Sequence, residues 1–192
     1  MHVFVTGSTG FVGTSVVKEL LSAGHSVVSL TRSNNGEAQL TSQGATPLRG
    51  TINDLDLLKK AAREADGIIH LAFIHDFSNY AGACSIDRAA ISALAKAAGT
   101  EKPLLVTSST GLIPAVVLGT EDDFDVSDPF LAMRGQSETL VHYLARDKNV
   151  RASIVRLAPT THGNGSSGFT GFLAAAALSG SSGKVGYVES KT

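Results

Sequence analysis

The sequence predicts a doubly wound α/β fold, with one parallel sheet between two layers of helices. Short apolar, β-branched runs alternate along the chain with segments whose apolar residues recur at helical spacing. The first run, residues 2–6, leads into a glycine-rich turn and then a helix, as in a βαβ unit. With 192 residues, a single domain with a sizeable core is expected. We therefore expect one domain over residues 1–192, with six strands in the order 3-2-1-4-5-6.

Composition narrows the classes of partner. Hydrophobic residues make up 43% and charged residues 17% of the chain, which is typical of a globular protein. The net charge of −1 favours neither nucleic acid nor a membrane surface, and the alanine run 174–177 is too short to span a bilayer. Cys84 is the single cysteine, so no intrachain disulfide can form, and a buried structural thiol is expected. No signal peptide precedes the first strand. These features predict a cytoplasmic protein with a small-molecule ligand.

A glycine-rich turn follows the first strand and predicts a dinucleotide site. Gly7 permits a tight turn, Gly10 lets the backbone approach a pyrophosphate, and Gly13 lets the helix lie close to the strand. The amino terminus of the helix at residues 11–23 then offers N–H groups and a partial positive charge. The alternative is a glycine-rich turn without a ligand. The expected cofactor contacts are Gly7, Ser8, Thr9, Gly10, Phe11, Val12 and Gly13.

The end of the second strand indicates which dinucleotide is bound. This strand is expected at residues 25–30, and Arg32 and Ser33 follow it. An acidic residue at this place favours NAD by bonding the ribose 2′-hydroxyl, whereas an arginine can pair with a 2′-phosphate. Arg32 therefore favours NADP over NAD, with Ser33 as a second contact. An ordinary exposed loop arginine is the alternative.

The middle of the chain predicts the centre of the sheet. A short helix is expected near 36–43, a third strand at 46–50, a helix from Asn53 or Asp54 to about 65, and a continuous fourth strand at 66–73. We expect His70 to be a hydrogen-bonded core histidine. His75 and Asp76 follow this strand at the edge where open α/β sheets bind ligands, and His75 is a candidate proton donor. A solvated loop pair is the other interpretation.

The second half of the chain continues the alternation. A helix over 79–98 precedes a fifth strand, 104–109, that ends in three hydroxyl residues, Thr107, Ser108 and Ser109. An acidic loop over 110–128 lacks the spacing of a metal site, and no metal is expected. Asp128 caps a helix over 129–147, and a sixth strand follows at 151–158. Beyond it we expect a loop at 163–168 and a helix at 169–179.

Two motifs resemble those of the extended and atypical short-chain dehydrogenase/reductase superfamily, which includes NAD-dependent epimerase/dehydratase and NmrA-like proteins. These are the TGxxGxxG spacing from Thr6 to Gly13 and the D-x-x-x-H-L-A pattern from Asp66 to Ala72. The resemblance implies a Rossmann-type fold. It also implies that Ser109 holds the substrate oxygen. The further cofactor contacts it implies are Leu71, Ala72, Phe73, Thr107, Ser108, Pro159 and Thr160.

The superfamily's Tyr-x-x-x-Lys pair is missing. Aligned on Glu138, the lysine position is Arg134 and the tyrosine position is Phe130. Phenylalanine has no proton to transfer, while arginine keeps a charge that could bond the ribose. In a reductase the proton would then come from Ser109, His75 or His162.

Three functions therefore stay open. The first is an NADP-dependent oxidoreductase or epimerase-like enzyme acting on a small carbonyl or hydroxyl compound. The second is an NADP-sensing regulator without turnover, and the third is a repurposed fold that catalyses a non-redox isomerisation or cyclisation. Relative to the resembled superfamily, the substrate lobe after about residue 162 is minimal, absent or completed by another subunit. The helices near 79–98 and 129–147 resemble the superfamily's dimer interface, which implies a homodimer.

Overall fold

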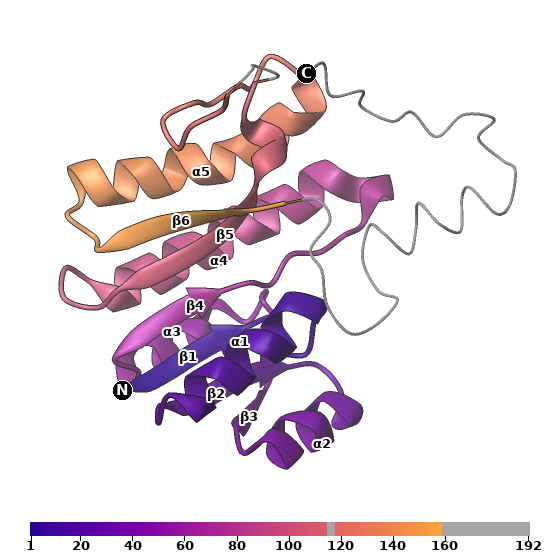
Figure 1. The fold of residues 1–192 in the computed structure, drawn as a ribbon, viewed down its shortest axis with the longest axis vertical. Helices are drawn as coiled ribbons and strands as arrows, with labels where there is room; N and C mark the ends of the chain where they lie inside the picture. Colours follow the sequence, from indigo (N-terminus) through magenta and orange to yellow (C-terminus); the bar gives the residue numbers. More distant parts are fainter. Residues whose placement is uncertain (115–117, 159–192) are drawn as a thin grey trace, which may run out of the picture.

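Six parallel strands form one sheet in the order β3-β2-β1-β4-β5-β6 (Figure 1), as the sequence predicts. The computed structural model describes residues 1–114 and 118–158. All neighbouring strands pair in parallel. The strands are β1 (His2–Thr6), β2 (Ser26–Thr31), β3 (Thr46–Arg49), β4 (Gly67–His70), β5 (Leu104–Ser109) and β6 (Ala152–Leu157).

Helices cover both faces of this sheet and give the three predicted layers. They are α1 (Phe11–Ser22), α2 (Asn34–Gln43), α3 (Leu55–Glu64), α4 (Tyr80–Ala98) and α5 (Pro129–Asp147), with short 3-10 turns η1 (Phe77–Asn79) and η2 (Thr110–Leu112). On one face, α1 and α2 pack over the β1–β2 region around Val5, Val17 and Leu40. On the other, α3, α4 and α5 enclose the larger core around Phe4, Leu58 and Leu94.

The glycine turn brings α1 very close to the end of β1. Gly7 has φ +74°, a left-handed conformation that glycine adopts without strain. A Cβ added at Gly13 would lie 2.1 Å from the Gly7 carbonyl oxygen, so no side chain fits there. A Cβ added at Gly7 would lie 2.7 Å from the Ala72 amide nitrogen. The two glycines therefore allow close backbone contact between β1, α1 and the segment after β4.

One predicted strand is shorter than expected. The sequence predicts a continuous strand over 66–73, whereas β4 ends at His70. Its neighbour β1 ends at Thr6 and turns at Gly7, so the β1–β4 ladder stops at the Thr6–His70 pair. Beyond it, Leu71 N–H donates to the Thr6 carbonyl oxygen (3.2 Å) and Ala72 N–H donates to Thr6 Oγ1 (3.3 Å). The remaining residues, up to Ile74, run past the glycine turn without strand pairing.

The other expected elements are present, with boundaries shifted by one or two residues. The fifth strand has the predicted bounds, and Asp128 caps α5 by accepting from the Phe130 and Leu131 amides. The predicted features beyond Ala158, including Pro159, Thr160, His162, the helix at 169–179 and the substrate lobe, lie outside the described residues. Within residues 1–114 and 118–158, no helix has the length and apolarity needed to cross a bilayer.

The Gly13 contact gives a direct stability prediction. Gly13→Ala places a methyl group against the Gly7 carbonyl and should lower the free energy of unfolding more than Gly24→Ala does. Gly24 has φ +79° and open space around its added Cβ, so its substitution costs about 1–2 kcal/mol of backbone strain alone. Urea denaturation of both variants measures the difference. Equal losses would show that the turn relaxes to admit a side chain.

Candidate functional site

The predicted site residues collect along one edge of the sheet, because the carboxyl ends of parallel strands share an edge. The glycine turn follows β1, Arg32 follows β2, Leu71–Phe73 follow β4, and the three hydroxyl residues end β5. This arrangement matches the rule that ligands bind open α/β sheets at the carboxyl ends of the strands. The structure therefore places the predicted residues within the described part of the chain along a common edge.

The amino terminus of α1 suits an anionic group. Gly10 is its N-cap, and no side chain within residues 1–114 and 118–158 accepts a hydrogen bond from the first amides of this helix. By contrast, Ser33, Asn79 and Asp128 cap α2, α4 and α5 with side-chain oxygens. The first turn of α1 also carries no acidic residue. The N–H groups and the positive end of the helix dipole thus fit a phosphate. Thr9 and Gly10 are exposed, whereas Ser8 is buried and donates to the Val5 carbonyl oxygen (3.0 Å).

The start of α2 packs against this turn. A Cβ added at Gly36 would lie 2.0 Å from Thr31 Oγ1 and 3.2 Å from Thr9 Cγ2. The Ser33 hydroxyl, predicted as a cofactor contact, accepts from the Gly36 amide (3.1 Å) and so closes the first turn of α2. Arg32 is exposed beside it. Sequence reasoning missed Gly36, although a glycine just inside a helix start signals close packing.

A second arginine lies near the same place. Arg49 is the last residue of β3 and pairs with Thr31, the last residue of the neighbouring strand β2. Arg32 follows Thr31 directly, so the two arginines lie at the ends of adjacent strands. Arg49 Nη1 donates to Asn34 Oδ1 (2.8 Å) and Glu37 Oε1 (3.1 Å). These bonds tie its guanidinium to the first turn of α2.

A buried polar network lies behind the edge and links four elements, β1, β4, α4 and α5. The Asp87 carboxylate, fully buried on α4, accepts from Ser137 Oγ (2.7 Å) and from Arg134 Nη1. A carboxylate can only accept, so His70 Nε2 donates to Asp87 Oδ1 (3.3 Å). His70 Nδ1 in turn lies 2.7 Å from Thr6 Oγ1. His70 is therefore the hydrogen-bonded core histidine that the sequence predicts, and the network reaches from α5 to the end of β1.

The same network fixes Arg134, the residue at the family's lysine position. Arg134 Nη2 donates to the Thr107 carbonyl oxygen (2.6 Å), and its guanidinium lies 4.6 Å from the centroid of the Phe73 ring. Asp87 holds the other arm. Burial by itself would raise the pKa of Asp87, but the hydrogen bond from His70 and the Arg134 charge outweigh it and hold that pKa below its usual value. Arg134 thus has a fixed position against the backbone of β5 at Thr107.

Aromatic rings gather in front of Arg134. Tyr80 and Phe130 stack with centroids 4.1 Å apart and planes 12° apart, and Phe77 stacks on both. Phe73 meets Tyr80 edge to face at 5.9 Å. Phe77 and Phe130 are 60% and 43% exposed, so this cluster forms an apolar surface next to the candidate site.

The adjacent loop residues His75 and Asp76 make different contacts. The His75 ring meets Phe73 edge to face at 5.2 Å and joins the aromatic cluster. Asp76 instead accepts from the Ser78 amide (3.0 Å) and hydroxyl (2.5 Å), which lowers the pKa of its carboxyl. Asp76 therefore caps η1, while His75 keeps its place as a predicted proton donor.

The β5 hydroxyls point in different ways. Thr107 Oγ1 donates to the His70 carbonyl oxygen (3.1 Å), which ties β5 to β4. Ser109 Oγ accepts from the Gly111 amide (3.1 Å) and caps η2, and its proton remains available to a ligand oxygen. The Ser108 hydroxyl is buried and has no hydrogen-bond partner among the described residues. Ser109 thus combines a turn role with a position at the site.

An ion pair fixes the other side of α5. The buried Glu138 carboxylate accepts two hydrogen bonds from Arg156 Nε (both 3.1 Å) and one from Arg156 Nη2 (2.8 Å). Arg156 Nη1 also donates to the Asp123 carbonyl oxygen (2.8 Å), which anchors the acidic loop. Asp123 itself accepts from Thr120.

Over residues 1–114 and 118–158, no group of three His, Cys, Asp or Glu side chains could hold a metal.

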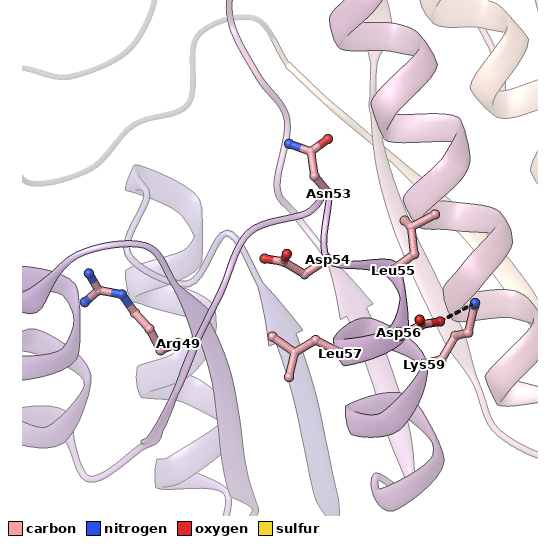
Figure 2. A pocket seen from close by; sticks show the side chains of 7 residues that line it. All are labelled: Arg49, Asn53, Asp54, Leu55, Asp56, Leu57 and Lys59. Atoms are coloured by element: carbon pink, nitrogen blue, oxygen red, sulfur yellow. Dashed lines mark hydrogen bonds and ion pairs between the residues drawn. The ribbon is translucent and has the colours of Figure 1, made fainter.

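An open hollow lies at the end of β3 and includes Arg49 among its lining residues. Figure 2 shows it between the end of β3 and the start of α3, lined by Arg49, Asn53, Asp54, Leu55, Asp56, Leu57 and Lys59. Lys59 pairs with Asp56 (2.8 Å), and Asp54 accepts from the Thr51 amide (2.6 Å) to close the turn before α3. None of the predicted catalytic residues lines this hollow.

Sequence reasoning missed Asp87, Tyr80 and Arg156. Asp87 carried one signal, because it is the one carboxylate of an alanine-rich helix and needs a hydrogen-bonding partner if it is buried. Tyr80 does not match the family motif, because Cys84 rather than a lysine stands four residues after it. Its ring stacks instead on Phe130 of a different helix, a contact that no local spacing reveals.

The Asp87 network predicts the response to mutation and to acid. Asp87→Asn leaves the Arg134 charge without its buried counter-ion and should lower the free energy of unfolding by about 3–5 kcal/mol at neutral pH. The folded pKa of Asp87 is depressed, so its contribution is complete above the unfolded pKa and is lost as pH falls through the folded value. The gap between the two proteins should narrow below about pH 4. Chemical denaturation across this range measures it. A gap independent of pH would contradict an ionised Asp87.

Comparison with known proteins identifies the family of this chain. The model of the NAD-dependent epimerase/dehydratase family matches residues 3–186. An uncharacterized protein of Schizosaccharomyces pombe is 45% identical over 175 residues, 90% of this chain and 58% of that protein. An uncharacterized protein of Saccharomyces cerevisiae is 42% identical over 192 residues, 98% of this chain and 63% of that protein. The chain thus spans about three fifths of the length of these relatives.

Solved structures share the fold. A UDP-glucose 4-epimerase of Thermotoga maritima, solved with UDP-glucose, has a TM-score of 0.71 at 19% identity, over 94% of this chain and 64% of that one. A short-chain dehydrogenase/reductase superfamily protein of Agrobacterium tumefaciens, solved with bound NAD, has a TM-score of 0.65 at 22% identity, over 81% of this chain and 48% of that one. From its sheet order, its glycine turn and its match over residues 3–186, the chain belongs to the NAD-dependent epimerase/dehydratase family.

Proposed function

We propose that this protein binds NADP(H) and acts as an oxidoreductase or epimerase-like enzyme on a small carbonyl or hydroxyl compound. The observation that carries the proposal is the glycine turn, whose close packing leaves the uncapped amino terminus of α1 beside the carboxyl ends of the strands. Gly7 and Gly13 let the turn and the helix pack against the neighbouring backbone, while Thr9 and Gly10 stay exposed at the start of α1, where a pyrophosphate would fit. A bound nicotinamide would supply the redox chemistry.

Charge supports NADP over NAD. Arg32 is exposed directly after β2, where the ribose of a bound dinucleotide is expected, and Arg49 lies in register with the neighbouring Thr31. Glu37, the acidic residue in the first turn of α2, is paired with Arg49. A 2′-phosphate would therefore meet positive charge at this place.

Substitution of Arg32 tests the choice of cofactor. Arg32→Asp should weaken NADP binding about 10- to 100-fold, because a charge-assisted hydrogen bond is worth about 1.5–3 kcal/mol, and should change NAD binding far less. Arg63→Asp is the matched control, with the same change of charge in the last turn of α3, away from the nucleotide edge. Calorimetry gives both affinities. Equal weakening of NADP and NAD would refute the 2′-phosphate role, and failure of the unaltered protein to bind either nucleotide would refute the cofactor site.

A second candidate is an NADP-sensing regulator without turnover. Phe130 favours it, because this ring stands at the family's tyrosine position and has no proton to give. A repurposed, non-redox isomerase or cyclase is the remaining alternative, in which Ser109 and His75 would do the proton transfer.

Turnover separates these functions. An oxidoreductase should oxidise NADPH in the presence of at least one member of a panel of aldehydes and ketones, measured by the loss of absorbance at about 340 nm, and Ser109→Ala should slow this reaction about 100-fold or more. Because Ser109 also caps η2, Ser109→Thr, which keeps the hydroxyl, serves as the control. NADPH binding without consumption across the panel would favour the regulator.

We further propose a homodimer through α4 and α5. Both helices lie on the same face of the sheet (Figure 1), and the outer positions of α4 include small exposed residues such as Ala81, Ser85 and Ala89 that would allow close helix packing. Light scattering on the full protein tests this proposal, since a monomer at micromolar concentration would exclude a stable pair.

A further inference from the structure

A tyrosine in the first turn of α4 stacks on Phe130, the residue that the resemblance aligns with the family's tyrosine. Tyr80 begins α4 and Phe130 lies in the first turn of α5, and their rings stack almost in parallel at 4.1 Å. One turn further along, α4 presents Cys84 and α5 presents Arg134. Both helices follow parallel strands, so both start at the edge where the nucleotide cradle lies.

Arg134 lies between this tyrosine and the backbone of β5. Its guanidinium packs on Phe73, whose ring also meets Tyr80, and its other arm bonds the Thr107 carbonyl, two residues before Ser109. Asp87, one turn after Cys84 on α4, holds the guanidinium in this place. Tyr80, Arg134 and Ser109 thus come from three elements, α4, α5 and β5, and all lie toward the edge of the sheet where its strands end.

We propose that Tyr80 of α4 is the proton-transferring residue of this enzyme, working with Arg134 of α5 as a tyrosine–cation pair assembled across two helices. This inference rests on the proposed NADP(H)-dependent reaction. In the family pattern the tyrosine and the cation stand four residues apart on one helix. In this chain the phenol is carried by Tyr80 of the preceding helix, α4, which stacks on Phe130, whereas the cation, Arg134, is on α5.

The chemistry balances in the reductive direction. If bound, a reduced nicotinamide would supply the hydride that the carbonyl carbon needs and would be the group that is oxidised. The O–H bond of Tyr80 breaks as its proton forms the O–H bond of the alcohol product. The phenolate that remains lies near the Arg134 charge, and a proton from water restores it. Ser109 donates a hydrogen bond to the same substrate oxygen.

The ionisation of the phenol agrees with an acid role. Burial raises the pKa of Tyr80 to about 12, with a further upward contribution from Cys84, while the charge of Arg134 acts to lower it. The hydroxyl is therefore protonated at neutral pH, as a proton donor to a developing alkoxide must be. The nearby guanidinium favours the phenolate once the proton has left.

Conservative variants test the proposal through turnover. Tyr80→Phe keeps the stacked ring and removes only the hydroxyl, so NADPH affinity should stay within about twofold while carbonyl reduction falls about 10²- to 10⁴-fold. Tyr143→Phe is the control, because Tyr143 is 46% exposed in the second half of α5. Adding Phe130→Tyr to Tyr80→Phe should restore part of the rate, since it returns a phenol to the partner ring. A Tyr80→Phe enzyme within threefold of the unaltered rate would overturn the assignment and leave the NADP(H) function standing.

Chemical footprinting tests the position without turnover. N-acetylimidazole acetylates accessible phenol oxygens, and mass spectrometry of peptides reports each tyrosine separately. Saturating NADP⁺ should protect Tyr80 at least fivefold and leave Tyr143 unchanged. Unchanged labelling of Tyr80 with NADP⁺ bound would overturn the proposal. Failure of NADP⁺ or NADPH to bind at all, seen by calorimetry, would overturn the proposed function and this inference together.

Discussion

The close approach of α1 to the end of β1 is the constraint on which the candidate site depends. Gly13 lies against the Gly7 carbonyl, and Gly7 lies against the backbone of Leu71 and Ala72, so three segments meet with no side chain between them. This contact ends the β1–β4 ladder at His70 and directs the following residues along the edge of the sheet. It also leaves the first amides of α1 without a side-chain cap, where a phosphate is the fitting partner.

The buried Asp87 carboxylate organises the other half of the edge. A fully buried charge needs hydrogen bonds and a counter-ion, and Asp87 obtains them from Ser137, His70 and Arg134. Because these partners come from β4 and α5, one carboxylate sets the spacing between α4, α5 and the centre of the sheet. Its geometry holds the Arg134 guanidinium beside the carbonyl of Thr107 and against the ring of Phe73. The ion pair between Glu138 of α5 and Arg156 of β6 fixes the position of α5 relative to β6 in the same way.

These two constraints explain how the fold accommodates an arginine at position 134 and a phenylalanine at position 130. The cation at position 134 is fixed by groups behind it rather than by a tyrosine on its own helix, so the ring at position 130 can vary. The stack of Tyr80 on Phe130 then keeps an aromatic surface in front of the cation. The sheet order and the glycine turn agree with the family, whereas the surroundings of position 134 depend on this chain's own side chains.

Local patterns in the sequence were enough to predict the sheet order and the glycine turn. Alternating apolar runs specify strands and helices, and glycines at 7, 10 and 13 specify a close backbone turn at the end of the first strand. The position of Arg32 after β2 followed from the same local order, and so did the placing of His70 in the core. The length of β4 did not follow, because it is set by where β1 ends and turns.

Contacts between side chains that are distant in the sequence also depend on tertiary packing. Asp87 and Arg134 are 47 residues apart in the chain, and their contact requires α4 to pack against α5. The same packing stacks Tyr80 on Phe130, a pair that no motif spacing predicts. Elements can be predicted because their hydrogen bonds and periodicity are local, whereas the site is built from contacts between elements, which depend on how the helices pack on the sheet.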